Sequence, residues 1–340
     1  MPTQLLPATP ENIARAAAIL KGGGLVAFPT ETVYGLGANA LDAAAVARIF
    51  AAKGRPFADP LIVHLSGPDQ LPRVVRAVSP LSRILAETFW PGPLTLVLPR
   101  QPQVPPLVTA GLDTVAVRVP DHPVALALLR AAGVPIAAPS ANRFGHTSPT
   151  TAQHVWHDLH GRIDLILDGG ATPVGVESTV LDASTSPARI LRPGGVTAEM
   201  LEAVIGPVTV LQREPGGDQG LPSPGLLETH YAPHAELIFC QGRNAHQALV
   251  AELHAALAAG KRIGVLALDE EVDSLAQAGA LVYPLGADLS SAARRLYAGM
   301  RWLDAQGVDV ILARDLGVGG LGLAIRDRLT RAATRVVTAD

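Results

Sequence analysis

The stretch LVAFPTETVYGLG, residues 25–37, joins a short apolar run to a turn made of hydroxyl, carboxylate and glycine residues. The apolar run 25–28 predicts a buried strand, and the polar side chains of 30–34 follow its carboxyl end. Ligands bind at this end of the strands in α/β sheets, and glycines such as Gly35 let a ligand approach the backbone closely. The stretch therefore favours an α/β fold with a polar site here, although an ordinary polar turn is the alternative.

Elements on both sides of this stretch fit the same fold class. Thr9 as a cap, Pro10 at the first helical position and Gly22 at the end predict a helix that leads into the strand. Further strands are predicted at LIVHL, LTLVL, TVAVRV, PIAAP, DLILD, STVLD and ARILR, with helices over 42–52, 122–132 and 150–160. LTLVL and TVAVRV, like STVLD and ARILR, follow each other too closely for a crossover helix, so we expect a twisted mixed sheet.

The pattern changes after residue 207. Residues 208–235 are rich in proline and glycine and predict a linker. Residues 236–340 alternate strand and helix regularly, and the predicted helix over 321–335 is the last element. We expect a catalytic domain over 1–207, a linker over 208–235 that closes over the active site, and a smaller Rossmann-like parallel α/β domain over 236–340.

Composition limits the function classes. The 340 residues carry a formal net charge of −3 and one cysteine, Cys240, which excludes an intramolecular disulfide and favours a reducing, cytoplasmic location. No signal peptide and no membrane span are expected from the sequence. Residues 1–207 hold 15 Lys and Arg against 15 Asp and Glu, so a polybasic nucleic-acid binder is not indicated.

Two cations stand in the loop KGRPFADP. Lys53 and Arg55 lie two residues apart in a glycine- and proline-shaped turn, which could clamp phosphate or could be a solvated basic loop. His64 lies inside a predicted strand, where a structural histidine is the usual interpretation. Arg118 lies among valines and must find an anion or reach solvent, so a substrate carboxylate is one candidate partner.

Small polar side chains follow two later strands. Ser140 and Asn142 end PIAAP, while Ser148 and Thr150 precede a helix, where either one could cap the helix or bind an anion. His154, His157 and His160 could form a metal-binding face, but a partly exposed helix surface is favoured.

A glycine fingerprint near the carboxyl end competes with this site. Residues 317–322, GVGGLG, fit the dinucleotide pattern, but we expect no further strand to carry the acidic residue that holds a ribose. A glycine-rich turn is therefore favoured. No P-loop sequence occurs.

The motifs PTETVYGLG, KGRP, PSAN, SPT, GVESTV and ILRPG, in this order, together resemble the YrdC-like L-threonylcarbamoyladenylate synthases. The resemblance extends into SPGLLETHYAPHAEL and the last α/β region, which indicates the longer, two-domain form. It implies a nucleotidyltransferase that makes L-threonylcarbamoyl-AMP and pyrophosphate from L-threonine, bicarbonate and ATP. Mg²⁺ would accompany ATP, and the protein would hold no tightly bound organic cofactor. A separate machinery would transfer the threonylcarbamoyl group to tRNA.

The resemblance also implies roles for particular residues. Lys53 and Arg55 would be catalytic. The threonine side would be formed by Thr32, His64, Arg118, Ala138 and Ser178. The ATP side would be formed by Lys53, Arg55, Asp59, Ser140, Asn142, Ser148, Arg192 and Tyr231, with no assigned metal ligand. Tyr231 would fold back over the nucleotide.

Asp59 departs from the family pattern, which has asparagine at this position. A carboxylate beside phosphate repels it, so Asp59 would face Mg²⁺ or solvent, or would tune nucleotide affinity.

Three other functions compete with the synthase. A carbamoyl-adenylate-handling domain of the hydrogenase-maturation type shares the core, but its zinc finger is excluded by the single cysteine. A weak RNA-binding module and a dinucleotide-dependent oxidoreductase based on 317–322 are the others.

Overall fold

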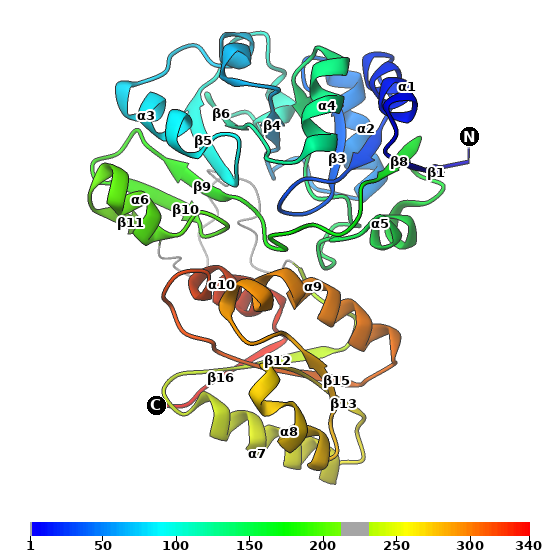
Figure 1. Cartoon of the computed structure of the whole chain (residues 1–340), viewed down its shortest axis with the longest axis vertical. Coiled ribbons are helices and arrows are strands. Elements are labelled where there is room, and N and C mark those ends of the chain that lie inside the picture. Colours follow the sequence, from blue (N-terminus) through cyan, green and yellow to red (C-terminus); the bar gives the residue numbers. More distant parts are fainter. Residues whose placement is uncertain (1, 212–230) are drawn as a thin grey trace. The chain divides into compact units, whose positions relative to one another are not determined.

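The computed structural model describes residues 2–211 and 231–340, and these divide into two compact units. The first unit comprises the described residues up to 211 except 145–147 and 174–176, which group with 231–340 in the second. Figure 1 labels the elements of both units.

Within residues 2–211, eleven strands form one sheet. Their order is β1 (Gln4–Pro7), β8 (Leu165–Asp168), β2 (Val26–Phe28), β3 (Gly35–Asn39), β7 (Ile136–Ala137), β4 (Ile62–His64), β6 (Thr114–Arg118), β5 (Leu94–Pro99), β9 (Thr179–Asp182), β10 (Ala188–Arg192) and β11 (Val208–Val210). The helices of this region are α1 (Pro10–Lys21), α2 (Ala43–Lys53), α3 (Pro80–Phe89), α4 (Pro123–Ala132), α5 (Ala152–Leu159) and α6 (Ala198–Ile205), with 3₁₀ turns η1 (Pro68–Arg73) and η2 (Pro106–Val108).

The sheet is mixed, as predicted. β5 and β6 pair antiparallel, as do β9 and β10, whereas β4 and β6 are parallel. The stretch that opens the sequence forms the antiparallel pair β2 and β3 with the polar turn between them. The sequence reading missed β3, because two glycines in five residues conceal a strand, and it missed β1, α3, α6 and β11 as well.

Both faces of this sheet are apolar. Leu25 and Ala27 belong to one buried cluster with Phe50 of α2, while Val26 and Phe28 belong to another with Leu20 of α1. Successive strand residues point to opposite faces, and helices cover both faces, so the run shows no polar alternation.

Helix ends follow local chemistry. The Thr9 side chain accepts a hydrogen bond from the Asn12 amide at the start of α1, as predicted. Asp42 caps α2, which ends at Gly54 in the left-handed conformation (φ 68°). That turn redirects the chain between Lys53 and Arg55.

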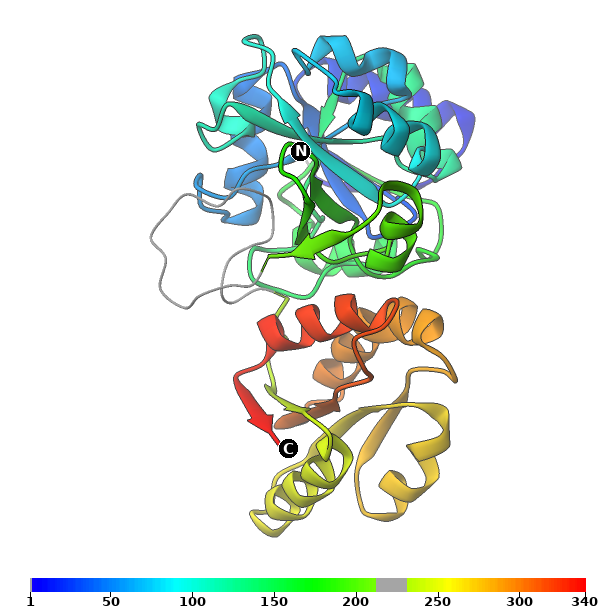
Figure 2. The same ribbon diagram turned by 90° about the vertical axis from the view of Figure 1, so that its left-hand side faces the viewer.

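The second unit contains a parallel five-stranded sheet among the described residues. Its order is β14 (Leu281–Pro284), β13 (Ile263–Ala267), β15 (Val310–Arg314), β12 (Glu236–Gln241) and β16 (Arg335–Thr338). Its helices are α7 (Ala245–Ala258), α8 (Val272–Gln277), α9 (Leu289–Ala305) and α10 (Gly322–Ala332), with the 3₁₀ turn η3 (Asp269–Glu271). Figures 1 and 2 show α7 and α8 on one face of this sheet and α9 and α10 on the other, which is the Rossmann-like arrangement predicted.

The end of the chain corrects one expectation. The last predicted helix, 321–335, ends as α10 at Ala332, and β16 then adds a strand. The sequence argument against a dinucleotide site assumed that no strand follows, which is wrong, but β16 contains no carboxylate. The glycines form a tight turn, because a Cβ on Gly322 would lie 2.5 Å from the Gly317 carbonyl oxygen.

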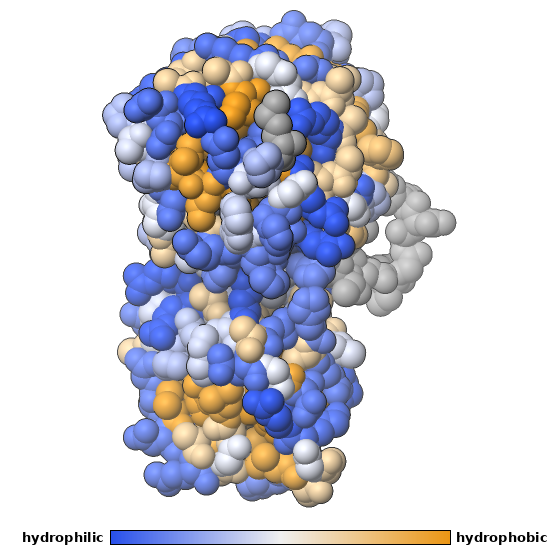
Figure 3. Space-filling view, turned by 90° about the vertical axis from the view of Figure 1, so that its right-hand side faces the viewer, coloured by the Kyte–Doolittle hydropathy of each residue, from blue (hydrophilic) through white to orange (hydrophobic). Residues whose placement is uncertain are grey.

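No helix in the described ranges 2–211 and 231–340 is long and apolar enough to cross a membrane. On the face shown in Figure 3, hydrophilic residues surround separate groups of apolar ones.

Candidate active site

The polar turn between β2 and β3 is rigid and buried. The Thr30 hydroxyl donates to the Val33 carbonyl at 2.6 Å and lies 2.8 Å from the Thr32 hydroxyl. The amides of Thr32 and Val33 both lie within hydrogen-bonding distance of the Thr30 oxygen. Because the turn satisfies its own groups, it fixes where Glu31 and Thr32 point.

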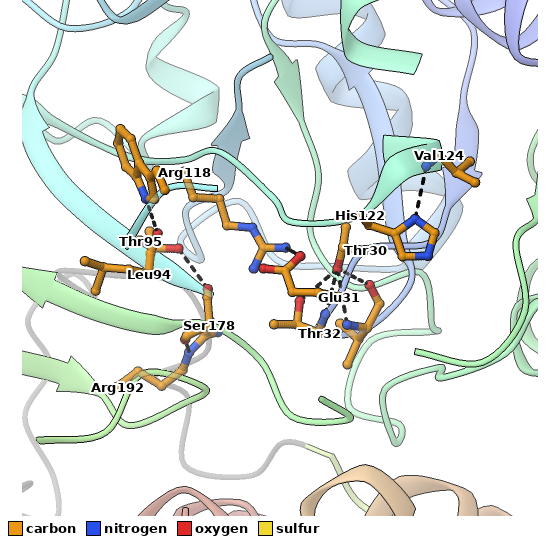
Figure 4. A network of polar contacts seen from close by, with 12 residues as sticks. Thr30, Glu31, Thr32, Leu94, Thr95, Arg118, His122, Val124, Ser178 and Arg192 are labelled. Atoms are coloured by element: carbon orange, nitrogen blue, oxygen red, sulfur yellow. Dashed lines mark hydrogen bonds and ion pairs between the residues drawn. The ribbon is translucent and has the colours of Figure 1, made fainter. Parts of the chain in front are cut away.

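Glu31 and Arg118 form a buried ion pair at the centre of the sheet. Glu31 Oε2 lies 3.1 Å from Arg118 Nη2, and each side chain is at most 4% exposed. Glu31 Oε1 and Arg118 Nε have no hydrogen-bond partner among the described residues. Figure 4 shows the two side chains pointing toward one another. The pair is therefore only half satisfied, which costs stability unless a ligand completes it.

His64 lies beside this pair. Strand register places His64 opposite Arg118 across β4 and β6, and its ring packs edge-on against Phe28 at 6.2 Å. Burial, followed by the Arg118 charge, holds the pKa of His64 well below its usual range. The imidazole is therefore neutral, and its Nδ1 has no hydrogen-bond partner in the described ranges.

Ser178 and Arg192 form the neighbouring side of the site. Arg192 Nη2 donates to the Ser178 carbonyl at 2.9 Å, and the Ser178 hydroxyl lies 2.8 Å from that of Thr95. The register of β9 and β10 shifts between Ile190 and Arg192, and such a bulge re-aims the side chain. Burial lowers the pKa of Arg118, Glu31 raises it and Arg192 lowers it, so these charges share one electrostatic environment.

Backbone hydrogen bonds tie the motif loops together. The Tyr34 amide donates to the Pro149 carbonyl, and the Ala141 amide donates to the Tyr34 carbonyl, at 2.9 and 2.8 Å. Ser148 donates to Glu177 Oε1 at 2.6 Å. The Ala138 amide donates to the Ile62 carbonyl at 2.9 Å. Motifs that are far apart in the sequence thus meet along one side of the sheet.

Lys53 supports one of these loops. Its ammonium donates to the carbonyls of Ser140 and Asn142 at 2.6 and 2.5 Å, and the side chain is buried. Burial and then the Arg55 charge lower the pKa of Lys53, whereas Asp158 and Asp59 raise it. Lys53 therefore shapes the loop that carries Ser140 and Asn142.

Asp59 is the partner of Arg55. Asp59 is fully buried, and its Oδ2 lies 2.8 Å from Arg55 Nη2. Arg55 also donates to the Pro60 carbonyl at 2.9 Å. The expectation that Asp59 faces solvent is wrong, because the neighbouring guanidinium holds it inside the loop.

Tyr231 lies in the second unit. Its ring is buried, packs 5.7 Å from the Tyr297 ring and carries the Arg328 guanidinium at 5.3 Å. Most of the expected closing linker, residues 212–230, lies outside the described residues.

The helix α5 bears the predicted cap and the three histidines. Thr151, and neither Ser148 nor Thr150, caps this helix through the His154 amide. His160 stacks on Trp156, and the part of the chain that the structure describes contains no group of three His, Cys, Asp or Glu residues suited to a metal ion.

Contacts link two groups of the expected site residues. One group is Thr32, His64, Arg118, Ala138, Ser178 and Arg192 around the Glu31–Arg118 pair, and the other is Lys53, Arg55, Asp59, Ser140, Asn142 and Ser148 in the adjoining loops. Sequence reasoning gave no role to Glu31, Thr95 or Glu177. The available signals for Glu31 were a carboxylate in the polar turn 30–34 and, separately, a valine-flanked arginine at 118 that needs an anion, whereas nothing in the sequence marked Thr95.

The architecture and site define an α/β protein of the YrdC-like class. Residues 18–194 match the Sua5/YciO/YrdC family model, described as telomere recombination, and residues 196–334 match the Sua5 C-terminal model, described as the C-terminal domain of threonylcarbamoyl-AMP synthase. The chain belongs to the Sua5/YciO/YrdC family, in its two-domain form.

Known relatives agree over nearly the whole chain. The threonylcarbamoyl-AMP synthase of Bacillus subtilis is 47% identical over 97% of this chain and 95% of its own, and that of Pyrococcus abyssi is 47% identical over 94% of each. The crystal structure of P. abyssi Sua5 complexed with L-threonine superposes with a TM-score of 0.91 at 42% identity, covering 99% of this chain and 100% of that one.

The neutral His64 generates a prediction about pH. The folded pKa lies below the unfolded value near 6.5, so as pH falls below about 6.5 the unfolded state binds a proton that the folded state does not. Stability should fall with decreasing pH, at a slope that approaches about 1.4 kcal/mol per pH unit for this group.

Urea unfolding between pH 7 and 5.5 measures this effect, with His64→Gln beside the parent chain. The variant should lose part of the slope, while His157→Gln, at an exposed histidine, should keep it. Equal slopes in the parent chain and His64→Gln would contradict a neutral, buried imidazole.

Proposed function

We propose that this chain condenses L-threonine, bicarbonate and ATP into L-threonylcarbamoyl-AMP and pyrophosphate, the first step of tRNA threonylcarbamoyladenosine formation. The observation that carries the proposal is the half-satisfied Arg118 at the centre of a buried polar site, in a chain that matches a threonine-complexed relative over its whole length. Arg118 spends Nη2 on Glu31 and keeps Nε without a partner among the described residues, and the carboxylate of an amino acid can accept from that donor.

For this reaction the protein has to align the substrates and screen their charges, and it does not need a nucleophilic side chain of its own. The amine of threonine, once it has lost its extra proton, adds to CO₂ released from bicarbonate with loss of water, which gives a carbamate. One carbamate oxygen then attacks the α-phosphorus of ATP, and pyrophosphate leaves. Arg118 would hold the threonine carboxylate, while the neutral His64 and Thr32 face the rest of the amino acid. With all three substrates held in one complex, the reaction would proceed as an effectively unimolecular step.

The cations of the adjoining loops would serve the nucleotide. Arg192 and Arg55 provide guanidinium groups, and Lys53 keeps Ser140 and Asn142 in place. Mg²⁺ would arrive on the ATP phosphates as part of the substrate. Such fixed charges stabilise the charge that develops on the phosphates.

Domain roles are part of the same proposal. Residues 1–207 would be the catalytic domain, 208–235 the linker that closes over it, and 236–340 its support. Tyr231 packs on Tyr297 and Arg328 and would have to leave that packing to reach the nucleotide. The product would pass to a tRNA-modifying transferase in the cytoplasm, and any contact with RNA would be weak because the charge of 1–207 is balanced.

Pyrophosphate release from ATP with bicarbonate and Mg²⁺ tests the function. Release should depend on L-threonine and be slower with L-serine or without an amino acid. Arg118→Ala should lower kcat/KM for threonine at least about 30-fold, because it removes the buried cation that would pair with the threonine carboxylate. Arg189→Ala, at an exposed arginine of β10, should behave like the parent chain. Release that is indifferent to threonine would overturn the proposal.

Asp59 generates a second prediction. Asp59→Asn removes the charge that neutralises Arg55 and keeps a hydrogen-bond acceptor of the same size, so the dissociation constant for ATP should fall about threefold to tenfold. Calorimetric titration with MgATP measures the change, and Asp69→Asn, at an exposed position, is the control. An unchanged or weaker affinity for ATP in Asp59→Asn would show that Asp59 does not restrain Arg55.

A further inference from the structure

We propose that Glu31 binds the α-ammonium group of the amino-acid substrate through its free oxygen, Oε1. This inference rests on the proposed function and deepens it, because none of the residues expected on the threonine side provides an anionic acceptor for that ammonium.

The two oxygens of the Glu31 carboxylate differ in their contacts. Glu31 Oε2 is occupied by Arg118 Nη2 at 3.1 Å, whereas Oε1 is buried and has no hydrogen-bond partner among the described residues. A buried charged acceptor without a partner costs more than a neutral one. The Glu31 side chain is only 4% exposed, so it cannot turn to bulk solvent to recover that cost.

The turn that carries Glu31 keeps this oxygen in place. Thr30, which precedes Glu31, bonds to the Thr32 hydroxyl and to the Val33 carbonyl, which follow it, so these hydrogen bonds bridge the backbone of Glu31. Figure 4 shows the turn, Glu31 and Arg118 as one continuous polar group. The carboxylate is therefore pre-organised for a ligand.

Two further polar atoms near Glu31 match the remaining groups of a hydroxy amino acid. Arg118 Nε is an unused donor. His64 Nδ1 also has no hydrogen bond of normal geometry among the described residues, although the Ile62 and Ile136 backbone groups near the ring raise its pKa, and the neutral ring can donate or accept according to its tautomer. A hydroxy amino acid carries a carboxylate, an ammonium and a hydroxyl. These three groups match a donor on Arg118, an acceptor on Glu31 and a two-way partner on His64.

Charge also favours an ammonium at Glu31. Arg118 already carries the positive charge that a substrate carboxylate needs, and the nearby Arg192 adds another. A second anion at Glu31 Oε1 would be repelled, whereas a zwitterion places its positive end on Glu31 and its negative end on Arg118. The ion pair thus acts as a template for a zwitterion.

The test compares two ligands that differ only at the α-position. L-Threonine and (2S,3R)-2,3-dihydroxybutanoate share the carboxylate and the β-hydroxyl, but the second has a hydroxyl in place of the ammonium. Calorimetric titration of the full chain without ATP should give a preference for threonine of about tenfold to a hundredfold, as expected for a charge-assisted hydrogen bond. Glu31→Gln should reduce this preference to about threefold or less.

The ratio of the two affinities is the readout, because a general loosening of the pocket weakens both ligands alike. Glu31→Asp, which keeps the charge, should retain part of the preference. Glu11→Gln, at an exposed carboxylate of α1, should retain all of it.

The outcomes separate this inference from the proposed function. If the parent chain releases pyrophosphate in response to threonine and Glu31→Gln still prefers threonine as strongly, the role of Glu31 is overturned and the function stands. If the parent chain neither binds threonine nor responds to it, the proposed function fails and this inference fails with it.

Discussion

The rest of the site depends on one buried guanidinium. Arg118 ends β6 in the middle of the eleven-stranded sheet, where water cannot solvate its charge. A lone buried cation would be strongly destabilising, and Glu31 provides the compensating charge. That requirement explains why the turn after β2 is polar, why it is braced by Thr30, and why it lies beside β4 and β6.

Glu31 balances the charge of Arg118 but does not complete the hydrogen bonds of either side chain, and the remaining polar atoms can bind a ligand. A pair with every hydrogen bond made would be inert, whereas Glu31 Oε1, Arg118 Nε and His64 Nδ1 remain available within the described structure. The neighbouring cations differ from Arg118. Lys53 is engaged by backbone carbonyls and Arg55 by Asp59, so they shape and balance the adjoining loops before any nucleotide binds. The two halves of the site are thus held by different means, one by a charge pair open to a ligand and the other by internal contacts.

Sequence patterns predicted the fold class and the grouping of motifs well. Capping residues, apolar runs and the spacing of strands without crossovers predicted α1, the mixed sheet and the parallel second sheet, and the structure confirms them. Two kinds of short strand were missed. In β3 glycines replace β-branched residues, and β16 has only four residues. The sequence could not predict which side chains contact one another in the folded chain. Asp59 could be seen as unusual, but only the fold shows that its carboxylate faces Arg55, and Thr95 becomes visible only through its contact with Ser178.

The most direct measurement of the central claim observes Arg118 itself. Its Nε–H should give a ¹H–¹⁵N signal, which Arg118→Lys would assign by its disappearance. Titration with L-threonine should shift this signal in proportion to the bound fraction, because the group gains a partner, while D-threonine at the same concentrations should shift it much less. A signal that stays unchanged when L-threonine has saturated the protein would contradict the claim that Arg118 receives the substrate.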